Sequence, residues 1–421
     1  MRGWEKFILS ELALRIIDCE HKTAPTQEKG FPSIRTPNIG KGRLLLENVN
    51  RVSEETYKLW TRRAKPKYPD LILAREAPLG NVAIIPKNLD VCLGQRTVLI
   101  SPDLDKVDPS FLCYRLLSDE LQNEMNARGG GSTVPHLNVK EIRNLPITIP
   151  PLPTQRRIAS ILSAYDDLIE NNLKRIKLLE GLAQRTHEEW FVKFTINGKK
   201  LEVNQETGLP EGWERRKLGE VVEINKKSLK KGFKGKIKYV DIASVSTGNI
   251  DSWTEYNFEE APGRARRVLR HGDTIWSCVR PNRKSFSIIW EPIENLIGST
   301  GFAVLSPKRV SAEFLYFSTT TETFVGYLSN RAGGAAYPAV TSSVFEEAEI
   351  VIPPNKIERD FSAFSKEVFS QIYTLKNQNR LLKESRDILL PRLMSGAIKL
   401  SESGFSELED KQDLKASKIV G

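Results

Sequence analysis

The sequence contains few of the residues from which metal and redox sites are built. It has only four cysteines and four histidines in 421 residues, and no two cysteines have the C-x-x-C spacing of zinc or redox sites. Cys19 and His21 are close enough in sequence to share a metal. Isolated reduced thiols are the simpler interpretation, and they are typical of the cytoplasm. We therefore expect no metal site and a cytoplasmic protein. The four cysteines are Cys19, Cys92, Cys113 and Cys278.

Long hydrophobic runs are also missing. No apolar stretch approaches the ~18 residues that a membrane span needs. The N-terminal segment has neither the apolar region nor the small-residue cleavage site of a signal peptide. Hydrophobic residues make up 39% of the chain and charged residues 28%, as in folded globular proteins rather than disordered ones. We expect a globular protein of two or three domains without a membrane or secretory segment.

The motifs of several enzyme classes are absent. No G-x-x-x-x-G-K-[ST] phosphate-binding loop occurs. The Pro-Pro pairs at 150–151 and 353–354 lack the flanking Asn or Asp and the aromatic residue of an adenine methyltransferase motif. Asp70 and Glu76 follow part of a nuclease pattern, but Pro78 stands where the catalytic lysine belongs. We expect a non-catalytic chain; metal-dependent cleavage by the purified protein would instead support a nuclease acting alone.

The balance of charge favours a polyanion as partner. Lysine and arginine outnumber aspartate and glutamate by 63 to 53, which gives a net charge of +10. Lysines crowd one stretch that also contains Gly232 and Gly235, which predicts a flexible loop that contacts phosphates; a merely solubilising loop is the alternative. The lysines of this stretch are Lys226, Lys227, Lys230, Lys231, Lys234, Lys236 and Lys238.

The two halves of the chain repeat each other at a shift of about 203 residues. Matches that keep their order along the whole length are unlikely to arise by chance, so we infer an internal duplication. In the stretches between the matched points, the residues of the two halves differ widely. This pattern indicates that the halves share a backbone fold but have different surfaces. The matched pairs are 128–135 with 331–338, 149–151 with 352–354, 70–74 with 273–277, 94–102 with 298–307, 33–40 with 239–246, and Trp4 with Trp213.

Each half begins with a region of mixed secondary structure. Short β-type runs at 82–85, 97–100, 288–290 and 302–305 are bounded by Gly, Pro and Asn. A short helix is expected at about 109–127, with its counterpart at about 311–329. This pattern predicts an α+β fold in each half.

Each half ends in one long amphipathic helix. The first is expected from Thr154, a plausible N-cap, to about Phe194, with Ile158, Leu168 and Ile176 in its apolar stripe. The second is expected from about Asn355 to Leu390. Two exposed stripes of similar length most simply bury each other as a coiled coil, which would be antiparallel if the halves are related by a pseudo-two-fold axis. Asn172 and Asn379 interrupt the stripes and would fix the register. The alternative is that each helix packs on its own domain.

The motifs at the junctions resemble the specificity subunit of type I restriction–modification systems. The segment PPLPTQRRIA at 150–159 looks like the opening of that family's central helix, and WFVKF at 190–194 looks like its end. LPEGWE at 209–214 looks like the entry to a second target-recognition domain, and LLPRLMSGAI at 389–398 looks like the end of the second helix. The resemblance covers nearly the whole chain up to about residue 400.

The resemblance implies the organisation and the partners of the protein. Residues 1–150 and 196–352 would be target-recognition domains, separated by spacer helices at 151–195 and 353–400. Residues 401–421, rich in Ser, Glu, Asp and Lys, show no resemblance, and we expect them to form a mobile tail. The domains would read the two parts of an asymmetric, bipartite double-stranded DNA target. Two modification (methyltransferase) subunits would dock on the chain, and restriction (motor-nuclease) subunits would join for cleavage. S-adenosylmethionine, ATP and Mg²⁺ would belong to those partners, so no cofactor is expected on this chain.

The loops that follow the short strands carry the candidate DNA contacts. Arginine can fork onto guanine, and asparagine or glutamine onto adenine, in the major groove. Any such residue can instead be a solvated charge, a turn residue or a cap. The candidates in the first half are Arg35, Asn38, Arg75, Gln95, Arg96, Thr97, Ser132, Thr133, His136 and Asn138; those in the second half are Lys230, Lys231, Lys234, Arg280, Asn282, Arg283, Ser299, Thr300 and Tyr337.

Two non-enzymatic alternatives remain at this point. One is an orphan DNA-binding scaffold or regulator that acts without modification subunits; neighbouring genes that encode a methyltransferase and a helicase-nuclease would decide against it. A general nucleic-acid binder would hold unrelated duplexes with equal affinity at high salt.

Overall fold

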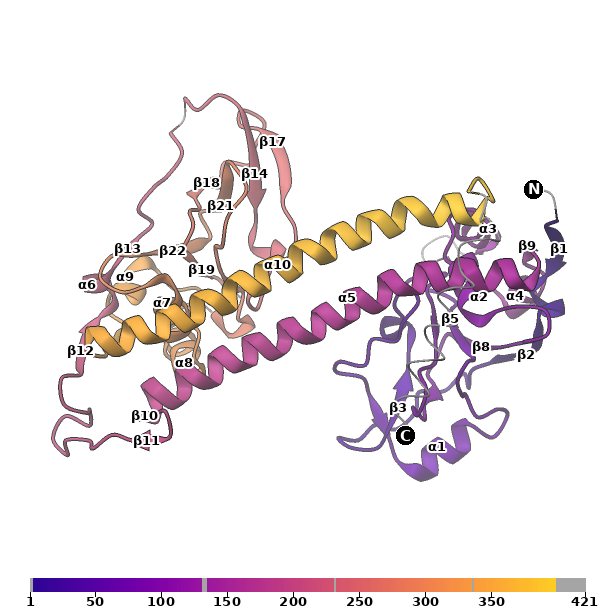
Figure 1. Ribbon diagram of the computed structural model, residues 1–421, viewed down its shortest axis with the longest axis horizontal. Coiled ribbons are helices and arrows are strands. Elements are labelled where there is room, and N and C mark those ends of the chain that lie inside the picture. The colour runs from indigo at the N-terminus through magenta and orange to yellow at the C-terminus, as the bar shows by residue number, and fades with distance from the viewer. Residues whose placement is uncertain (1–2, 131–134, 231, 335–336, 399–421) are drawn as a thin grey trace, which may run out of the picture. The chain divides into compact units, whose positions relative to one another are not determined.

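The computed structural model describes residues 3–130, 135–230, 232–334 and 337–398 (Figure 1). The chain divides into two compact units, one formed by residues 1–170 with 379–421 and the other by residues 171–378. The two long helices, α5 (Leu152–His187) and α10 (Asn355–Met394), each contribute one segment to each unit. The predicted tail at 401–421 lies outside the described residues. Among the described residues, no helix is both long and apolar enough to cross a membrane.

The first unit is built on a four-stranded antiparallel sheet in the order β2-β8-β5-β6. The first unit also contains a smaller, three-stranded sheet in the order β4-β3-β7. Strand β1 pairs with β9 in a separate two-stranded sheet. Successive side chains of a strand point to opposite faces, so Leu71 and Leu73 enter one core while Ile72 enters another. The elements are β1 (Glu5–Ile8), β2 (Ala13–Asp18), β3 (Phe31–Ile34), β4 (Arg51–Val52), α1 (Glu54–Trp60), β5 (Leu71–Ala74), β6 (Val82–Ile84), β7 (Cys92–Leu93), β8 (Thr97–Pro102), α2 (Pro109–Leu116), α3 (Asp119–Arg128), α4 (Val139–Arg143) and β9 (Pro146–Ile149).

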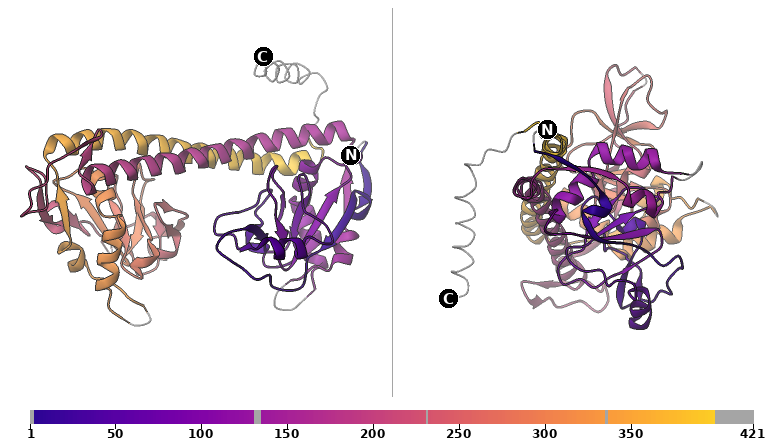
Figure 2. Two further views of the ribbon diagram at one scale, coloured as in Figure 1. Left: turned by 90° about the horizontal axis from the view of Figure 1, so that it is seen from below. Right: turned by 90° about the vertical axis from the view of Figure 1, so that its right-hand side faces the viewer.

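The second unit repeats this plan with the sheet β13-β22-β19-β20. Figure 2 shows the ribbon from two further sides, coloured by position along the chain. The smaller sheet of the second unit, β17-β14-β21-β18, has one strand more than that of the first unit, and β12 pairs with β23. The elements are β10 (Thr195–Ile196), β11 (Lys199–Lys200), β12 (Glu214–Lys217), α6 (Leu218–Val221), β13 (Val222–Ile224), β14 (Lys236–Val240), β15 (Val245–Ser246), β16 (Asn249–Ile250), β17 (Thr254–Asn257), β18 (Ala265–Val268), β19 (Thr274–Ser277), β20 (Phe286–Ile288), β21 (Leu296–Ser299), β22 (Phe302–Pro307), α7 (Ala312–Ser318), α8 (Glu322–Arg331), α9 (Ser342–Glu346) and β23 (Glu349–Ile352).

The duplication extends to individual hydrogen bonds. The N–H of Leu137 donates to the carbonyl of Arg75 at 3.0 Å, and the N–H of Val340 donates to the carbonyl of Cys278 at 2.9 Å, both displaced by 203 residues. The parallel pairing of β3 with β7 recurs as the parallel pairing of β14 with β21. The two halves therefore share one backbone plan, as their sequences predict.

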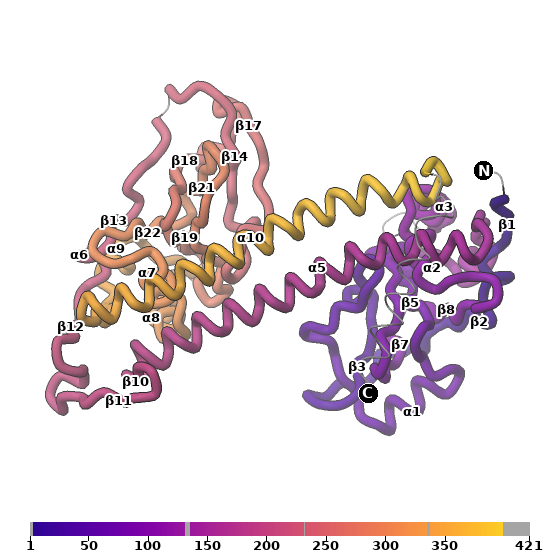
Figure 3. The backbone as a smooth tube through the Cα atoms, in the orientation of Figure 1, coloured from indigo at the N-terminus to yellow at the C-terminus, as the bar shows by residue number. Residues whose placement is uncertain are grey.

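The two long helices run in opposite directions within each unit. In the first unit Asn379 Nδ2 donates to the carbonyl of Ile169, and Arg386 pairs with Asp166. Residues later in α10 thus contact residues earlier in α5, as in an antiparallel pair. In the second unit the ring of His187 packs against that of Phe361. The buried positions of α10 recur at alternating steps of four and three, namely Phe361, Ser365, Val368, Ile372, Leu375 and Asn379. The backbone of both helices can be followed in Figure 3.

Three helix predictions need correction. The single helices expected at about 109–127 and 311–329 are each two helices, because the chain leaves the helical conformation at Ser118 and at Thr321, whose hydroxyl caps α8. The first long helix begins at Leu152, so Thr154 lies inside it and is not its N-cap, and its last turn, at Glu188–Val192, is π-helical. Leu168 is 52% exposed, and its neighbour Ile169 occupies the buried position instead.

Candidate nucleic-acid interface

Three segments of the first unit meet at one end of its central sheet, next to Ala74 of β5 and Thr97 of β8. The turn after β5 is bonded to the turn before β8, because the N–H of Arg75 donates to the carbonyl of Arg96 at 2.9 Å. The segment before α4 joins them, since the N–H of Leu137 donates to the carbonyl of Arg75. The predicted residues Arg75, Gln95, Arg96 and His136 therefore lie together, although they are up to 61 positions apart in the sequence.

A chain of charged side chains links these segments. Arg75 is buried, and its Nη1 donates to both carboxylate oxygens of Asp18 at 2.8 and 2.9 Å. Arg75 Nη2 lies 2.8 Å from His136 Nε2, and His136 Nδ1 lies 2.9 Å from Glu76 Oε2. The other Glu76 oxygen pairs with Arg96 Nη1 at 2.5 Å. Arg96 remains 60% exposed, so the buried Arg75 and the partly buried Asp18, Glu76 and His136 support an exposed guanidinium.

The hydrogen bonds assign the tautomer of His136. Arginine can only donate, so His136 Nε2 must accept the bond from Arg75. The proton of the neutral ring is then on Nδ1, where it is donated to the carboxylate of Glu76. Protonation of Nε2 would place two donors against each other. The two hydrogen bonds thus fix the orientation of the His136 ring.

Two members of the cluster are not predicted by loop composition. Asp18 ends strand β2, and its carboxylate binds Arg75 and, at 3.1 Å, His21 Nε2. His21 is itself 69% exposed and lies near Gln95, whose Nε2 donates to the carbonyl of His21 at 3.3 Å. An acidic strand end alone is a weak signal, because most such carboxylates are solvated. The contact of Asp18 with Arg75 becomes visible only once β2 is paired with β8.

The other candidates of the first half divide into exposed and internal side chains. Arg35 and Asn138 are exposed. Asn38 is buried and accepts from the N–H of Arg35, while the buried Thr97 hydroxyl donates to the carbonyl of Gly94. The base contacts predicted for Asn38 and Thr97 stay predictions, but the structure gives both residues an internal turn role. The further candidates Ser132 and Thr133 lie outside the described residues.

The same three segments converge in the second domain with different side chains. The N–H of Cys278 donates to the carbonyl of Gly301, and the N–H of Arg280 donates to the carbonyl of Pro338 at 2.7 Å. The Arg280 guanidinium stacks over the Tyr337 ring at 4.8 Å. Burial raises the pKa of the Cys278 thiol, at the position of Arg75, to about 11. Asn282, Arg283 and Thr300 are exposed here, whereas Ser299 is buried and its Oγ accepts from the N–H of Gly301.

The lysine-rich stretch lies beside the smaller sheet of the second domain. Lys227, Lys230 and Lys234 are exposed, while Lys226 pairs with Glu223 and Lys236 with Glu255. Lys231 lies outside the described residues. Lys238, in β14, stands over the half-exposed ring of Trp253 at 5.7 Å.

Strand β18 adds a basic edge that the sequence analysis did not single out. Arg266 stacks on Phe258 at 4.9 Å. The buried Nε of Arg267 has no hydrogen-bond partner within the described part of the chain, and burial lowers the pKa of this guanidinium. A guanidinium in that state favours an anionic ligand. The signal available in the sequence is the run Arg264, Arg266, Arg267 and Arg270.

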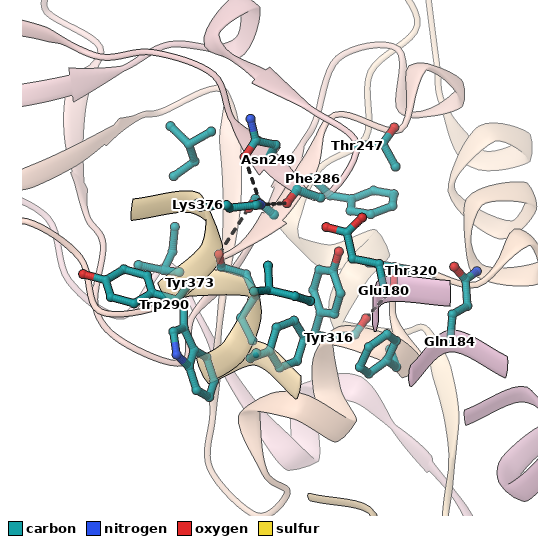
Figure 4. Close-up of a pocket in the computed structure, with 18 of the residues that line it drawn as sticks. Glu180, Gln184, Thr247, Asn249, Phe286, Trp290, Tyr316, Thr320, Tyr373 and Lys376 are labelled. Atoms are coloured by element: carbon teal, nitrogen blue, oxygen red, sulfur yellow. Dashed lines mark hydrogen bonds between the residues drawn. The ribbon is translucent and has the colours of Figure 1, made fainter. Parts of the chain in front are cut away.

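A cavity of about 350 Å³ lies elsewhere in the second unit, beside α10 (Figure 4). Aromatic side chains such as Trp290, Tyr316 and Tyr373 line it, and Lys376 Nζ donates to Asn249 Oδ1 at 3.0 Å. Burial lowers the pKa of Lys376, which the neighbouring carboxylates of Glu180 and Asp251 partly oppose. None of the predicted DNA contacts lines this cavity. The bond from Lys376 ties the β15–β16 hairpin to the long helix.

Residues that suggested a nuclease or a metal site have structural roles. Asp70 is buried, and its Oδ2 accepts from the N–H of Lys67; Asp273 repeats this turn with Arg270. In the described ranges no group of three or more His, Cys, Asp or Glu side chains is placed to hold a metal ion.

Known proteins with similar sequences are described as specificity subunits of type I restriction enzymes. The family model described as the type I restriction modification DNA specificity domain matches residues 1–180 and 210–384. The MjaIX type I specificity subunit of Methanocaldococcus jannaschii is 26% identical over 364 residues, which cover 83% of this chain and 82% of that protein. The HindI specificity subunit of Haemophilus influenzae is 24% identical over 389 residues, covering 76% and 84% of the two chains.

A solved structure supports the same fold. The crystal structure of the S subunit of the type I restriction–modification system from M. genitalium superposes with a TM-score of 0.59. It covers 93% of this chain and 96% of its own, at 18% sequence identity. At that identity the likeness concerns the fold alone. With the family model matching both halves of the sequence, this chain belongs to the type I restriction–modification DNA specificity family.

Proposed function

We propose that the chain is the specificity subunit that reads a bipartite, asymmetric DNA target for a type I restriction–modification complex. One observation carries the proposal: the same three backbone segments converge in both domains, but they present different side chains. The first domain presents Arg96 and His136, both held by the partly buried Glu76, and the second presents Arg280 and Tyr337. One backbone with two sets of donors and acceptors suits two different half-sites.

Affinity for DNA would come from the basic residues around these reading loops. Neutralising phosphates releases counterions, so exposed lysines and arginines strengthen binding without selecting a sequence. Lys227, Lys230 and Lys234, with the basic strand β18, supply such charges in the second domain. The buried turn residues Asn38, Thr97 and Ser299 are not part of this proposal.

The paired helices would act as the spacer between the two readers. Buried positions of α10 alternate at steps of four and three, as in a coiled coil, and Asn172 of α5 and Asn379 of α10 are both buried. A spacer of fixed length predicts a gap of constant length in the DNA target. Half-sites on one face of B-DNA would lie about 10 base pairs apart or at a multiple of that distance.

The exposed apolar side chains of the helices favour docking of other subunits. Leu178 of α5 and Leu381 of α10 occupy the same position in the repeat, 203 residues apart, and are 68% and 53% exposed. One equivalent exposed leucine in each unit suits two copies of one partner, which we propose are the modification subunits. Restriction subunits would join this assembly. S-adenosylmethionine, ATP and Mg²⁺ would be held by the partners, and the assembly would act in the cytoplasm.

The experiment is methylome sequencing of a host that expresses the chain with its modification subunit. The proposal expects one motif made of two short specified blocks around an unspecified gap. A continuous or palindromic motif would contradict two different reading domains. Specific binding by the chain alone, with no modification subunit retained in pull-down, would favour the orphan regulator instead.

A further inference from the structure

The two recognition domains place an arginine at different points of the same backbone. In the first domain Arg96 occupies the turn before β8, and its carbonyl accepts from the N–H of Arg75, the residue after β5. In the second domain the carbonyl of Gly301 accepts from the N–H of Cys278, the residue after β19, so Gly301 corresponds to Arg96. In the second domain Arg280 follows β19, and the residue 203 positions earlier is Ala77. Each domain therefore has one arginine and one small residue at this pair of positions.

Both arginines have a backbone conformation that residues other than glycine rarely adopt. Arg96 has a φ of 65° and Arg280 a φ of 51°, in the left-handed region. The small residue Ala77 shares this conformation with a φ of 40°, so the turn itself is common to both copies. A bulky residue kept in such a turn costs on the order of 1–3 kcal/mol, and such residues cluster at functional sites.

A specific neighbour orients each guanidinium. Glu76 Oε1 binds Arg96 Nη1 at 2.5 Å, while its other oxygen accepts from His136, so the carboxylate is fixed from both sides. Arg280 instead lies over the face of Tyr337 at 4.8 Å. An arginine has five N–H donors in a planar fork. An arginine oriented in this way loses less conformational entropy when it binds a base edge.

We propose that Arg96 and Arg280 are the specificity-determining residues of the two domains, each reading a guanine, with Glu76 and Tyr337 as their positioning residues. This inference rests on the proposed function. The arginine fork matches the O6 and N7 acceptors of guanine in the major groove. Because the two arginines occupy non-equivalent positions, the two guanines have different places within their half-sites.

The test is selection of binding sequences from a random DNA library by the chain assembled with its modification subunit. Arg96→Ala should reduce the preference for guanine about 10- to 100-fold at one position of one block, and leave the other block unchanged. Arg280→Ala should do the same in the other block. The conservative variants Arg96→Lys and Arg280→Lys keep the charge but lose the fork, so they should lose the guanine preference and keep affinity for unrelated DNA.

Matched controls separate base reading from charge. Lys284 shares the left-handed backbone of Arg280 and pairs with Glu322, and Arg62 is an exposed, ion-paired arginine of the first domain. Lys284→Ala and Arg62→Ala should leave both blocks of the motif intact. Glu76→Gln should weaken the guanine preference in the same block as Arg96→Ala, and circular dichroism should report an unchanged fold.

The outcomes distinguish this inference from the proposed function. If the unaltered complex selects no split motif, the proposed function fails. If it selects a split motif that Arg96→Ala and Arg280→Ala leave intact, the assignment of the two arginines fails and the function stands. A uniform loss of affinity for all sequences would identify both arginines as phosphate contacts and would overturn the assignment.

Discussion

The backbone N–H of Asp108 donates a 2.9 Å hydrogen bond to the side-chain Oε1 of Gln155, near the start of α5. The second half repeats the bond between Ser311 and Glu358 at 2.8 Å, 203 residues later. Gln155 is fully buried, and its Nε2 also donates to the carbonyls of Lys106 and Pro150. One amide thus fastens the long helix to the loop before α2.

Gln155→Ala should destabilise the first unit, because it leaves the N–H of Asp108 and the carbonyls of Lys106 and Pro150, the last of them buried, without their partner. Each such group costs about 1–3 kcal/mol, so we expect a loss of about 3 kcal/mol in the free energy of unfolding. Chemical denaturation followed by tryptophan fluorescence measures it. Ser160→Ala, at an exposed site on the same helix, should change stability by less than about 0.5 kcal/mol. Equal stabilities of the two variants would refute the anchoring role.

The stability of the second unit should fall in mild acid because of His187. This histidine is buried among Phe191, Phe314 and Phe361, and burial lowers its pKa to about 3. The unfolded chain binds its proton near the usual pKa of about 6.5, so the stability contribution is complete above that pH and declines between pH 6.5 and 3. From pH 7 to 5 the loss is about 2 kcal/mol.

His187→Gln removes the titrating group and should flatten this part of the pH profile, whatever its effect on stability at pH 7. Denaturation curves at several pH values measure the slope. His271→Gln is the control, because this histidine is exposed and its replacement should keep the slope of the unaltered chain. An unchanged slope in His187→Gln would mean that another group causes the acid sensitivity.

Replacing Lys227, Lys230 and Lys234 with alanine should reduce the salt dependence of DNA binding. Each lysine that neutralises a phosphate contributes roughly 0.9 to the slope of log K against log salt, so the slope should decrease by about 2–3. Fluorescence anisotropy with the cognate and an unrelated duplex measures both slopes. The sequence preference should not change. Lys193→Ala, at a lysine paired with Glu188 and Glu189, serves as the control; a slope unaffected by the triple change would indicate a merely solubilising stretch.

Leu178→Glu and Leu381→Glu should each remove one of two docking sites for the modification subunit. A charge at an exposed apolar contact opposes burial in an interface. Native mass spectrometry should detect two partner copies on the unaltered chain, one on each single variant and none on the double variant. Leu14→Glu, at an exposed leucine of β2, should retain both copies. Two copies on the double variant would exclude these leucines as contacts.

Local sequence signals predicted much of the architecture. Helical periodicity predicted the long helices, and the ordered matches predicted the duplication. The equivalent backbone hydrogen bonds of Leu137 and Val340 confirm this duplication. The breaks at Ser118 and Thr321 were missed because a capping residue inside an apolar pattern is a weak signal.

The charged cluster of the first domain depends on contacts that are distant in sequence. Asp18 and Arg75 are 57 residues apart and meet only through the pairing of strands, so no local pattern predicts them. Asn38 and Thr97 turn inward because a polar side chain in a turn readily bonds to nearby backbone groups. Residue type alone does not separate such turn residues from reading residues.

The division of the chain has a consequence for the order in which the protein is completed during synthesis. The second unit is a continuous stretch, residues 171–378, and all of it has been translated before the end of α10 exists. The first unit begins earlier but needs Leu393 and Met394 to close its core. The domain made first is therefore finished last. Until then we expect its apolar surface to be a target for chaperones, and a truncated chain that lacks the last turns of α10 should be cleared by proteases although residues 1–150 and 196–352 are both present.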